Sequence, residues 1–436
     1  MKPVIVPWSK LPKEKKQYYL NRSEIDISRV SESVSGIINA VRTEGDAALR
    51  KFTKEFDGFD SAGISLKVSR EEIDEAENNL DSTVKKALEY AIENITLFHE
   101  SQKPLSIHFK EIKPGILAGE KPTPIESAGL YVPRGRGSFP SMLYMLAIPA
   151  KVAGVERVCV VTPPDKEGKV DPGCLYAAKL CGVDEIYRAG GAQAIAALAY
   201  GTESIDPVVK ITGPGSMYVT AAKRLLYGMV DVGLPAGPSE SMVLADGSAD
   251  PWKVALDLLV ESEHGSDSSA ILVTDSLSLA EKTAEHVENL VENLPEPRKT
   301  FVTDVFSGYG VILLVDSMGK GADIVNTFAP EHLQIQTKEP FTTLSLIKNA
   351  GEILLGDNLP FSAANYVTGA NAVLPTGGTA KTFSAVSVRD FIKYSSVIYA
   401  TESGYNNFRD HVITLADYEG FVTHGNALKL REKTVD

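Results

Sequence analysis

Between residues 31 and 110, apolar side chains recur with the period of an α-helix. Two sets of residues follow this period: Val34, Ile37, Ile38 and Val41, and then Ile73, Leu80, Val84, Leu88 and Ile92. The pattern predicts two or three helices, which Gly58 and Gly63 interrupt. The first 30 residues are polar and irregular, so they form either an arm packed on a partner chain or a frayed end.

From about residue 125 onward, short apolar runs alternate with helical segments. In a first block, strands are predicted at 157–161, 185–188 and 208–211, with helices at 172–180 and 192–200. In a second block, strands are predicted at 241–245, 270–273, 311–315 and 352–355, with helices at 250–264 and 277–294. Asp250 is suited to cap the first of these helices, because Pro251 follows it and Gly265 lies just past the end. This alternation is typical of parallel sheets built from βαβ units.

The two blocks predict an α/β protein with two Rossmann-like parallel-sheet domains. Residues 1–30 are predicted to form an N-terminal helical arm. Residues 31–124 together with 239–380 form the first α/β domain, and residues 125–238 form a second domain inserted into it. Residues 381–436 form a small C-terminal tail domain, and no repeat of fixed period is evident.

Composition narrows the class of partner. The 436 residues carry a net charge of −13 and a pI of about 5.2, which argues against nucleic acid or anionic lipid as a partner. No apolar run approaches the roughly 18 residues of a membrane-spanning helix, and the first residues lack a signal-peptide core. Cys159, Cys174 and Cys181 form no disulfide framework and are expected to be reduced. The composition predicts a cytoplasmic enzyme or a cytoplasmic binding protein.

Glycine-rich segments follow several predicted strands, at the edge where open parallel sheets bind ligands. These segments lie at 190–193, 213–216 and 235–239. They are either ordinary turns or phosphate-binding loops, because none has the G-x-G-x-x-G spacing or a Walker lysine. Arg134 and Arg136 flank Gly135 on another such loop and either bind an anion or face solvent.

Three pairs of a carboxylate and an imidazole are candidates for chemistry. Glu261 and His264 share one helix face, so they either hold a divalent metal or form a solvated last turn. Glu331 and His332 lie between a predicted helix and a predicted strand, and form either an acid–base pair or a surface pair. Adjacent side chains of a strand point apart, so catalysis by both requires a bend in the chain. The third pair, at 419 and 424, is also compatible with a solvated turn.

Seven stretches taken together resemble the histidinol dehydrogenase family, from about residue 30 to residue 430. They are Ala128-Gly129-Leu130-Tyr131-Val132-Pro133, the segment 190–198, Ile211-Thr212-Gly213-Pro214-Gly215, Ala236-Gly237-Pro238-Ser239-Glu240, Glu263-His264-Gly265, Ala329-Pro330-Glu331-His332-Leu333 and Val373-Leu374-Pro375-Thr376. The order and spacing of the stretches are far more specific than any one of them.

The resemblance implies a zinc-dependent enzyme that uses NAD to oxidise a primary alcohol through an aldehyde to a carboxylate. It also implies a homodimer with intertwined C-terminal segments, each of which completes the partner's site. The residue roles that it implies are as follows: Glu331 activates water, His332 is the base, His264 and the other chain's His424 bind zinc, Glu419 binds the substrate amine, Ser141 and Ser239 line the substrate pocket, and Tyr131 and Gln193 contact NAD. A neutral His332 near pH 7 would accept the alcohol proton.

Five positions depart from the pattern of that family. Glu261 stands where the family has a glutamine ligand, Asn365 where it has an aspartate ligand, Ala372 where it has a substrate-pocket histidine, Ser216 where it has an asparagine that contacts NAD, and Arg134 where it commonly has glycine. The first two changes cancel in charge, so we expect Glu261, His264, Asn365 and His424 to bind zinc.

The pocket changes keep more than one function open. The simplest is oxidation of L-histidinol to L-histidine, a step of amino-acid biosynthesis. The alternative is another small polar or anionic primary alcohol, with Arg134 and Ala372 in its pocket. A third hypothesis is a catalytically inactive relative that only binds a metabolite. The Glu331–His332 pair argues against this hypothesis, because a binding protein does not need such a pair.

Overall fold

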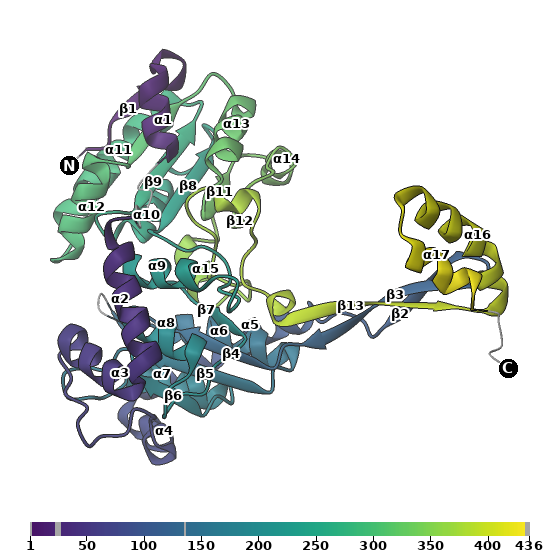
Figure 1. Cartoon of the computed structure of the whole chain (residues 1–436). Helices are drawn as coiled ribbons and strands as arrows, with labels where there is room; N and C mark the ends of the chain where they lie inside the picture. The colour runs from purple at the N-terminus through teal and green to yellow at the C-terminus, as the bar shows by residue number, and fades with distance from the viewer. Residues whose placement is uncertain (1, 22–27, 135–136, 432–436) are drawn as a thin grey trace. The chain divides into compact units, whose positions relative to one another are not determined.

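The computed structural model describes residues 2–21, 28–134 and 137–431. The chain forms two compact units (Figure 1). The first contains the chain up to Gln102 together with Ile125–Phe391, and the second contains Lys103–Pro124 together with the chain from Ile392. Within the described residues, no helix combines the length and hydrophobicity that a membrane-spanning segment needs.

The first unit contains a six-stranded sheet that is parallel throughout, in the order β1-β10-β9-β8-β11-β12. Its strands are β1 (Ile5–Pro7), β8 (Glu240–Ala245), β9 (Ser269–Thr274), β10 (Val311–Leu314), β11 (His332–Gln336) and β12 (Glu352–Leu355). One face packs on α10 (Pro251–Ser262), α11 (Leu277–Glu292), α12 (Arg298–Ser307) and α15 (Phe361–Tyr366). The other face packs on α1 (Lys13–Asn21), α13 (Met318–Phe328) and α14 (Pro340–Leu344). Both faces are buried, which explains why these strands are almost continuously apolar.

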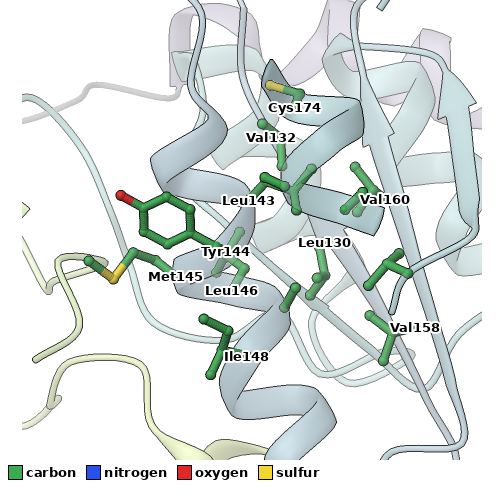
Figure 2. Close-up of a cluster of buried hydrophobic side chains, with 14 of the residues drawn as sticks. Leu130, Val132, Leu143, Tyr144, Met145, Leu146, Ile148, Val158, Val160 and Cys174 are labelled. Carbon is green, nitrogen blue, oxygen red and sulfur yellow. The ribbon is translucent and has the colours of Figure 1, made fainter. Parts of the chain in front are cut away.

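The same unit contains a four-stranded parallel sheet in the order β6-β5-β4-β7. Its strands are β4 (Ser127–Tyr131), β5 (Arg157–Thr162), β6 (Glu185–Arg188) and β7 (Lys210–Thr212). One face packs on α5 (Ser82–Glu100), α6 (Pro140–Ala153) and α7 (Pro172–Leu180), with α4 (Arg70–Glu75) alongside α7. Figure 2 shows part of this core, where Leu143 of α6 points towards Leu130 and Val160 of the sheet. The other face packs on α2 (Ser28–Glu44), α3 (Asp46–Phe52), α8 (Gly191–Tyr200) and α9 (Met217–Leu226).

The second unit is built on a three-stranded antiparallel sheet in the order β13-β3-β2. Its elements are β2 (His108–Lys113), β3 (Ile116–Pro124), β13 (Ile392–Ala400), α16 (Glu402–Glu419) and α17 (Val422–Lys429). All six residues of β2 are exposed. The unit also exposes large apolar side chains: Leu105, Phe109, Ile112, Tyr394, Ile398, Tyr399, Leu415, Tyr418, Phe421 and Val422.

The mixed α/β fold with parallel sheets confirms the predicted class, but the structure corrects four of the predicted domain assignments. The N-terminal segment is not a separate arm, because β1 pairs with β10 at the edge of the six-stranded sheet. Residues 31–102 pack on the four-stranded sheet instead of forming a domain with 239–380, because the apolar stripe of α2 buries itself against α8 and α9 and α5 packs on α6. Residues 103–124 belong with the C-terminal unit, because β3 pairs with β13 over nine residues. That unit begins at Ile392 rather than at 381, since Val386, Val388 and Phe391 are buried in the first unit.

Candidate active site

A cluster of charged side chains lies at the amino edge of the six-stranded sheet. Glu240, His332 and Glu352 are the first residues of β8, β11 and β12, and His332 stands in register with Glu352. A helix that connects two parallel strands returns to the amino edge of the sheet, so the end of α10 brings Glu261 there. Asn365 of α15 reaches the same place, since its Nδ2 donates a hydrogen bond to Glu261 Oε1 at 2.7 Å.

His332 is the centre of this cluster. Its side chain is buried, and Nδ1 lies 2.6 Å from Oε1 of Glu352 in a hydrogen bond. Nε2 lies 3.7 Å from Oε2 of Glu331 and 3.8 Å from Oε2 of Glu261. The ring also packs edge-on against Phe361, with 5.8 Å between the ring centres. Glu352 thus fixes the ring so that Nδ1 carries a proton and Nε2 faces the two other carboxylates.

The bend that catalysis by Glu331 and His332 requires is present, at the start of β11. Ala329 ends α13 with a φ of 53°, in the left-handed region that only a few non-glycine residues adopt. Pro330 then accepts a hydrogen bond from Gly351 N at 2.8 Å, and Oε2 of Glu331 accepts one from Glu240 N at 3.0 Å. Both side chains therefore lie together, with Nε2 of His332 3.7 Å from Oε2 of Glu331.

The electrostatics of the cluster favour a bound proton. Burial alone would lower the pKa of His332, but Glu261, Glu331 and Glu352 outweigh it and raise the pKa to about 10. Burial raises the pKa of Glu331 well above its usual range, and Glu261 and Glu240 add to the effect. Burial also opposes ionisation of Glu261, but His332, His264 and Asn365 hold its pKa below the usual value. In the chain alone, these carboxylates therefore favour the protonated form of the His332 ring.

The residues predicted to bind a metal lie beside this cluster. Nε2 of His264 is 3.6 Å from Oε2 of Glu261, and Nδ1 of His264 is 3.2 Å from the hydroxyl of Ser239. Oδ1 of Asn365 is buried without a hydrogen-bond partner among the described residues. A carboxylate, an imidazole and an unpaired amide oxygen fit a divalent cation such as zinc. The first unit brings only these three predicted ligands together, and no group of three or more His, Cys, Asp or Glu with metal-binding geometry occurs in the described chain.

The other predicted residues belong to other elements of the chain. Glu419 ends α16 and His424 is in α17, both exposed in the second unit. Ser141 is half-buried at the start of α6, and Ala372 packs on the core beneath the four-stranded sheet. Arg134 donates a hydrogen bond to Lys169 O at 3.2 Å and lies 3.7 Å from Asp165.

None of the contacts described for Arg134 joins it to Glu331 or His332. Its neighbours, Asp165 and Lys169, belong to the loop that follows β5, on the four-stranded sheet. The structure thus groups it with the predicted cofactor residues rather than with the charged cluster. Arg136, on the same loop, lies outside the described residues.

The predicted cofactor residues gather at the carboxyl edge of the four-stranded sheet. Tyr131 ends β4, and its hydroxyl accepts a hydrogen bond from Gly191 N at 3.2 Å. Gln193 is only 1% exposed, yet neither its Nε2 nor its Oε1 has a partner among the described residues. Ser216 precedes α9 and is exposed. Buried polar atoms without partners are rare and indicate a missing ligand or water, so this edge fits a polar cofactor.

The sequence alone did not identify two residues of the cluster. Glu352 was seen only as the start of a strand, and Glu240 only as part of a glycine-containing stretch. Glu240 and Glu352 share one sequence signal with His332. Each of the three is an ionisable residue at the first position of an otherwise apolar parallel strand. Because β8, β11 and β12 are neighbours in the sheet, such residues converge, but the sheet order is needed to see it.

Comparison with known proteins gives consistent matches over nearly the whole chain. A family model described as histidinol dehydrogenase matches residues 20–432. A histidinol dehydrogenase from Synechocystis is 52% identical over 411 residues, which cover 94% of this chain and 95% of that protein. A histidinol dehydrogenase homolog from Rhizobium meliloti is 49% identical over 422 residues, covering 97% of this chain and 92% of that protein. The crystal structure of histidinol dehydrogenase from Elizabethkingia anophelis has a TM-score of 0.93 at 34% identity, covering 98% of both chains.

Replacing Glu352 by glutamine tests the electrostatic account. The change removes one of three carboxylates around His332, so the pKa of His332 in the metal-free protein should fall from about 10 by roughly 1–3 units. A raised pKa stabilises the folded chain fully below about 6.5, the ordinary value, and this stabilisation is lost as the pH rises towards 10. In Glu352→Gln this stabilisation should be lost completely at a lower pH than in the parent protein.

NMR titration of the His332 ring measures the shift of its pKa. Glu71→Gln, which changes an exposed carboxylate, serves as a control. An unchanged titration midpoint of His332 in Glu352→Gln would contradict the assignment.

Proposed function

The chain belongs to the histidinol dehydrogenase family, and on this premise we propose that it uses NAD and zinc to oxidise a primary alcohol through an aldehyde to a carboxylate. The simplest substrate is L-histidinol, which would give L-histidine. Membership makes the protein an oxidoreductase. The observation that carries the proposal is the buried His332 ring, held by Glu352 with Nε2 facing Glu331. A protein that only bound a metabolite would gain nothing from such an arrangement.

The chain's own residues supply the proton transfers. Because Nδ1 of His332 is engaged by Glu352, Nε2 is the atom that takes the proton of the alcohol. Glu331 is anchored through Oε2 to the backbone of Glu240, which leaves Oε1 for a water molecule. Its raised pKa makes Glu331 a stronger base than an ordinary carboxylate, which suits the activation of water for the aldehyde step.

Zinc and NAD have separate candidate sites in the chain. Glu261, His264 and Asn365 would hold the metal, together with His424 of a second chain. Zinc bound there would fix the substrate and offset part of the negative charge that holds a proton on His332. Tyr131, Gln193 and Ser216 would bind NAD, which accepts hydride. The unpaired atoms of Asn365 and Gln193 support these two assignments.

Another small polar or anionic primary alcohol is the second candidate substrate. The observation that favours it is Ala372, which packs on the hydrophobic core and offers no polar side chain to an imidazole. The backbone there is held firmly, because buried Asn371 donates to Met145 O at 2.6 Å and lies 3.2 Å from Nε2 of His99. A shift of the loop that would bring in another polar group is therefore unfavourable.

A homodimer is part of the proposal, because the second unit is poorly covered as it stands. A three-stranded sheet needs a packed apolar face to be stable in water. Yet Ile398 is 72% exposed, Tyr418 89% and Val422 67%. Exposed apolar surface of this extent is typical of a protein interface. Association of two chains through this surface would bring Glu419 and His424 of one chain to the site of its partner.

Replacing His332 by asparagine should abolish most of the activity. Asparagine cannot take the alcohol proton, so the rate of NADH formation from L-histidinol by zinc-loaded protein should fall about 10²- to 10⁴-fold. A matched control is His286→Asn, since His286 packs against Trp252 far along the chain from the cluster. Turnover of the His332 variant near the parent rate would rule out its role as the base.

Exchanging the two unusual ligands tests the metal site. Glu261→Gln should weaken zinc binding about tenfold or more, because the only carboxylate of the ligand set is lost. The double variant Glu261→Gln, Asn365→Asp returns one carboxylate and should recover most of the affinity. Competition with a chelator measures both, with the neighbouring Glu263→Gln as a control. Equal zinc affinity in the parent and in Glu261→Gln would contradict the assignment.

The interface can be tested by placing a charge on it. Light scattering should give the parent protein twice the 47.0 kDa of one chain. Ile398→Glu should shift the mass towards that of a monomer, because a buried unpaired carboxylate opposes association. Phe341→Glu changes a residue that is 76% exposed in the first unit and should leave the mass unaltered. A monomeric parent protein would overturn the dimer.

A further inference from the structure

A carboxylate oxygen without a partner lies at the carboxyl edge of the four-stranded sheet. Oδ2 of Asp57 is buried and has no hydrogen-bond partner among the described residues. The same is true of both polar atoms of Gln193, a side chain that is almost fully buried. A buried polar atom without a partner costs free energy, so two such groups on one edge call for a ligand that pairs with them.

Asp57 and Gln193 both lie near Tyr131, the last residue of β4. That hydroxyl accepts a hydrogen bond from Gly191 N, and Gln193 is the third residue of the same helix, α8. The charge of Asp57 acts on the Tyr131 hydroxyl and helps burial to raise its pKa to about 12. Tyr131 therefore stays neutral, with its own proton available to a ligand.

The local chain holds Asp57 in place. It is the last residue of a π-helical turn, Thr53–Asp57, and Gly58 with a φ of 73° reverses the chain behind it. Phe59 then packs closely on Gly168, in the loop that follows β5. Asp57 therefore lies beside the loop that follows β5, the second strand of the β4-α6-β5 unit, although it comes from far earlier in the sequence.

In a dinucleotide-binding βαβ unit, an acidic residue after the second strand binds the hydroxyls of the adenosine ribose. The acid at that place here is Asp165, but it is already engaged. Its Oδ1 accepts hydrogen bonds from Glu167 N at 3.0 Å and Lys169 N at 2.7 Å, and its Oδ2 lies 3.7 Å from Arg134. Of these two carboxylates, Asp57 is the one with a buried oxygen that has no hydrogen-bond partner among the described residues.

We propose that Asp57 accepts hydrogen bonds from the adenosine ribose of the dinucleotide and thereby selects NAD over NADP. The inference rests on the proposed use of NAD. A carboxylate pairs well with two neighbouring hydroxyls, whereas the phosphate that NADP carries on that ribose would be repelled. Burial raises the pKa of Asp57 to about 6, whereas Arg134 opposes this rise and favours the charged carboxylate. Arg134 is itself paired with Asp165.

The test is direct binding of NAD⁺ to the full-length protein by calorimetry. Asp57→Asn should weaken NAD⁺ binding about tenfold or more, because the charged acceptor is lost. Asp60→Asn, which changes an exposed acid three residues on that pairs with Lys54, should bind NAD⁺ like the parent. The preference for NAD⁺ over NADP⁺ should narrow in Asp57→Asn but not in Asp60→Asn, a result that a merely structural role would not give.

Fragments of the dinucleotide locate the contact. ADP should lose affinity for Asp57→Asn as NAD⁺ does, whereas nicotinamide mononucleotide should not. A loss confined to the mononucleotide would overturn the assignment to the adenosine ribose. Equal binding of NAD⁺ by the parent and Asp57→Asn would overturn the inference and leave the proposed function standing. A parent protein that does not bind NAD⁺ would overturn the proposed function itself. Asp57→Ser serves as the second variant if Asp57→Asn does not fold.

Discussion

The hydrogen bond between His332 Nδ1 and Glu352, 2.6 Å long, fixes the arrangement of the charged cluster. Five ionisable side chains lie together there, and Glu240, Glu261, Glu331 and His332 are buried. Burying isolated charges would be strongly unfavourable. The cluster is tolerated because each carboxylate has a partner: Glu352 on His332, Glu331 on the backbone of Glu240, Glu261 on Asn365 and Glu240 on the backbone of Gly377. Removing one member leaves the others uncompensated, so chemistry and stability at this edge are coupled.

The two parallel sheets carry their clusters of polar side chains at opposite edges. The six-stranded sheet places its charged side chains at the amino ends of its strands, where α10 and α15 also end. The four-stranded sheet follows the usual rule, with its unpaired polar groups at the carboxyl ends of the strands. This division matches the proposed chemistry, since proton transfer needs a buried charged cluster and dinucleotide binding needs helix amino termini and backbone N–H groups.

Local patterns predicted much of the molecule. The alternation of strands and helices indicated the two parallel sheets, and the need for a bend at Glu331 could be stated before Ala329 was seen to supply it. Contacts between distant segments could not be predicted in this way. No local feature of α2 indicates which sheet its apolar stripe covers. The residues of Ile5–Pro7 likewise give no indication that this segment pairs with β10. For the same reason Glu352 was missed, because its role depends on the neighbour that the sheet order gives to β11.

In the proposed function, His332 takes the proton of the alcohol, and Glu331 then activates water for the oxidation of the aldehyde at the same carbon. The most direct measurement is the amount of NADH that zinc-loaded protein forms from a limiting amount of L-histidinol, beside short amino alcohols and anionic diols. The account predicts two NADH for each substrate molecule consumed, either with L-histidinol or, if Ala372 marks a different pocket, with another alcohol of the panel. One NADH for each substrate, or none with any alcohol, would contradict it.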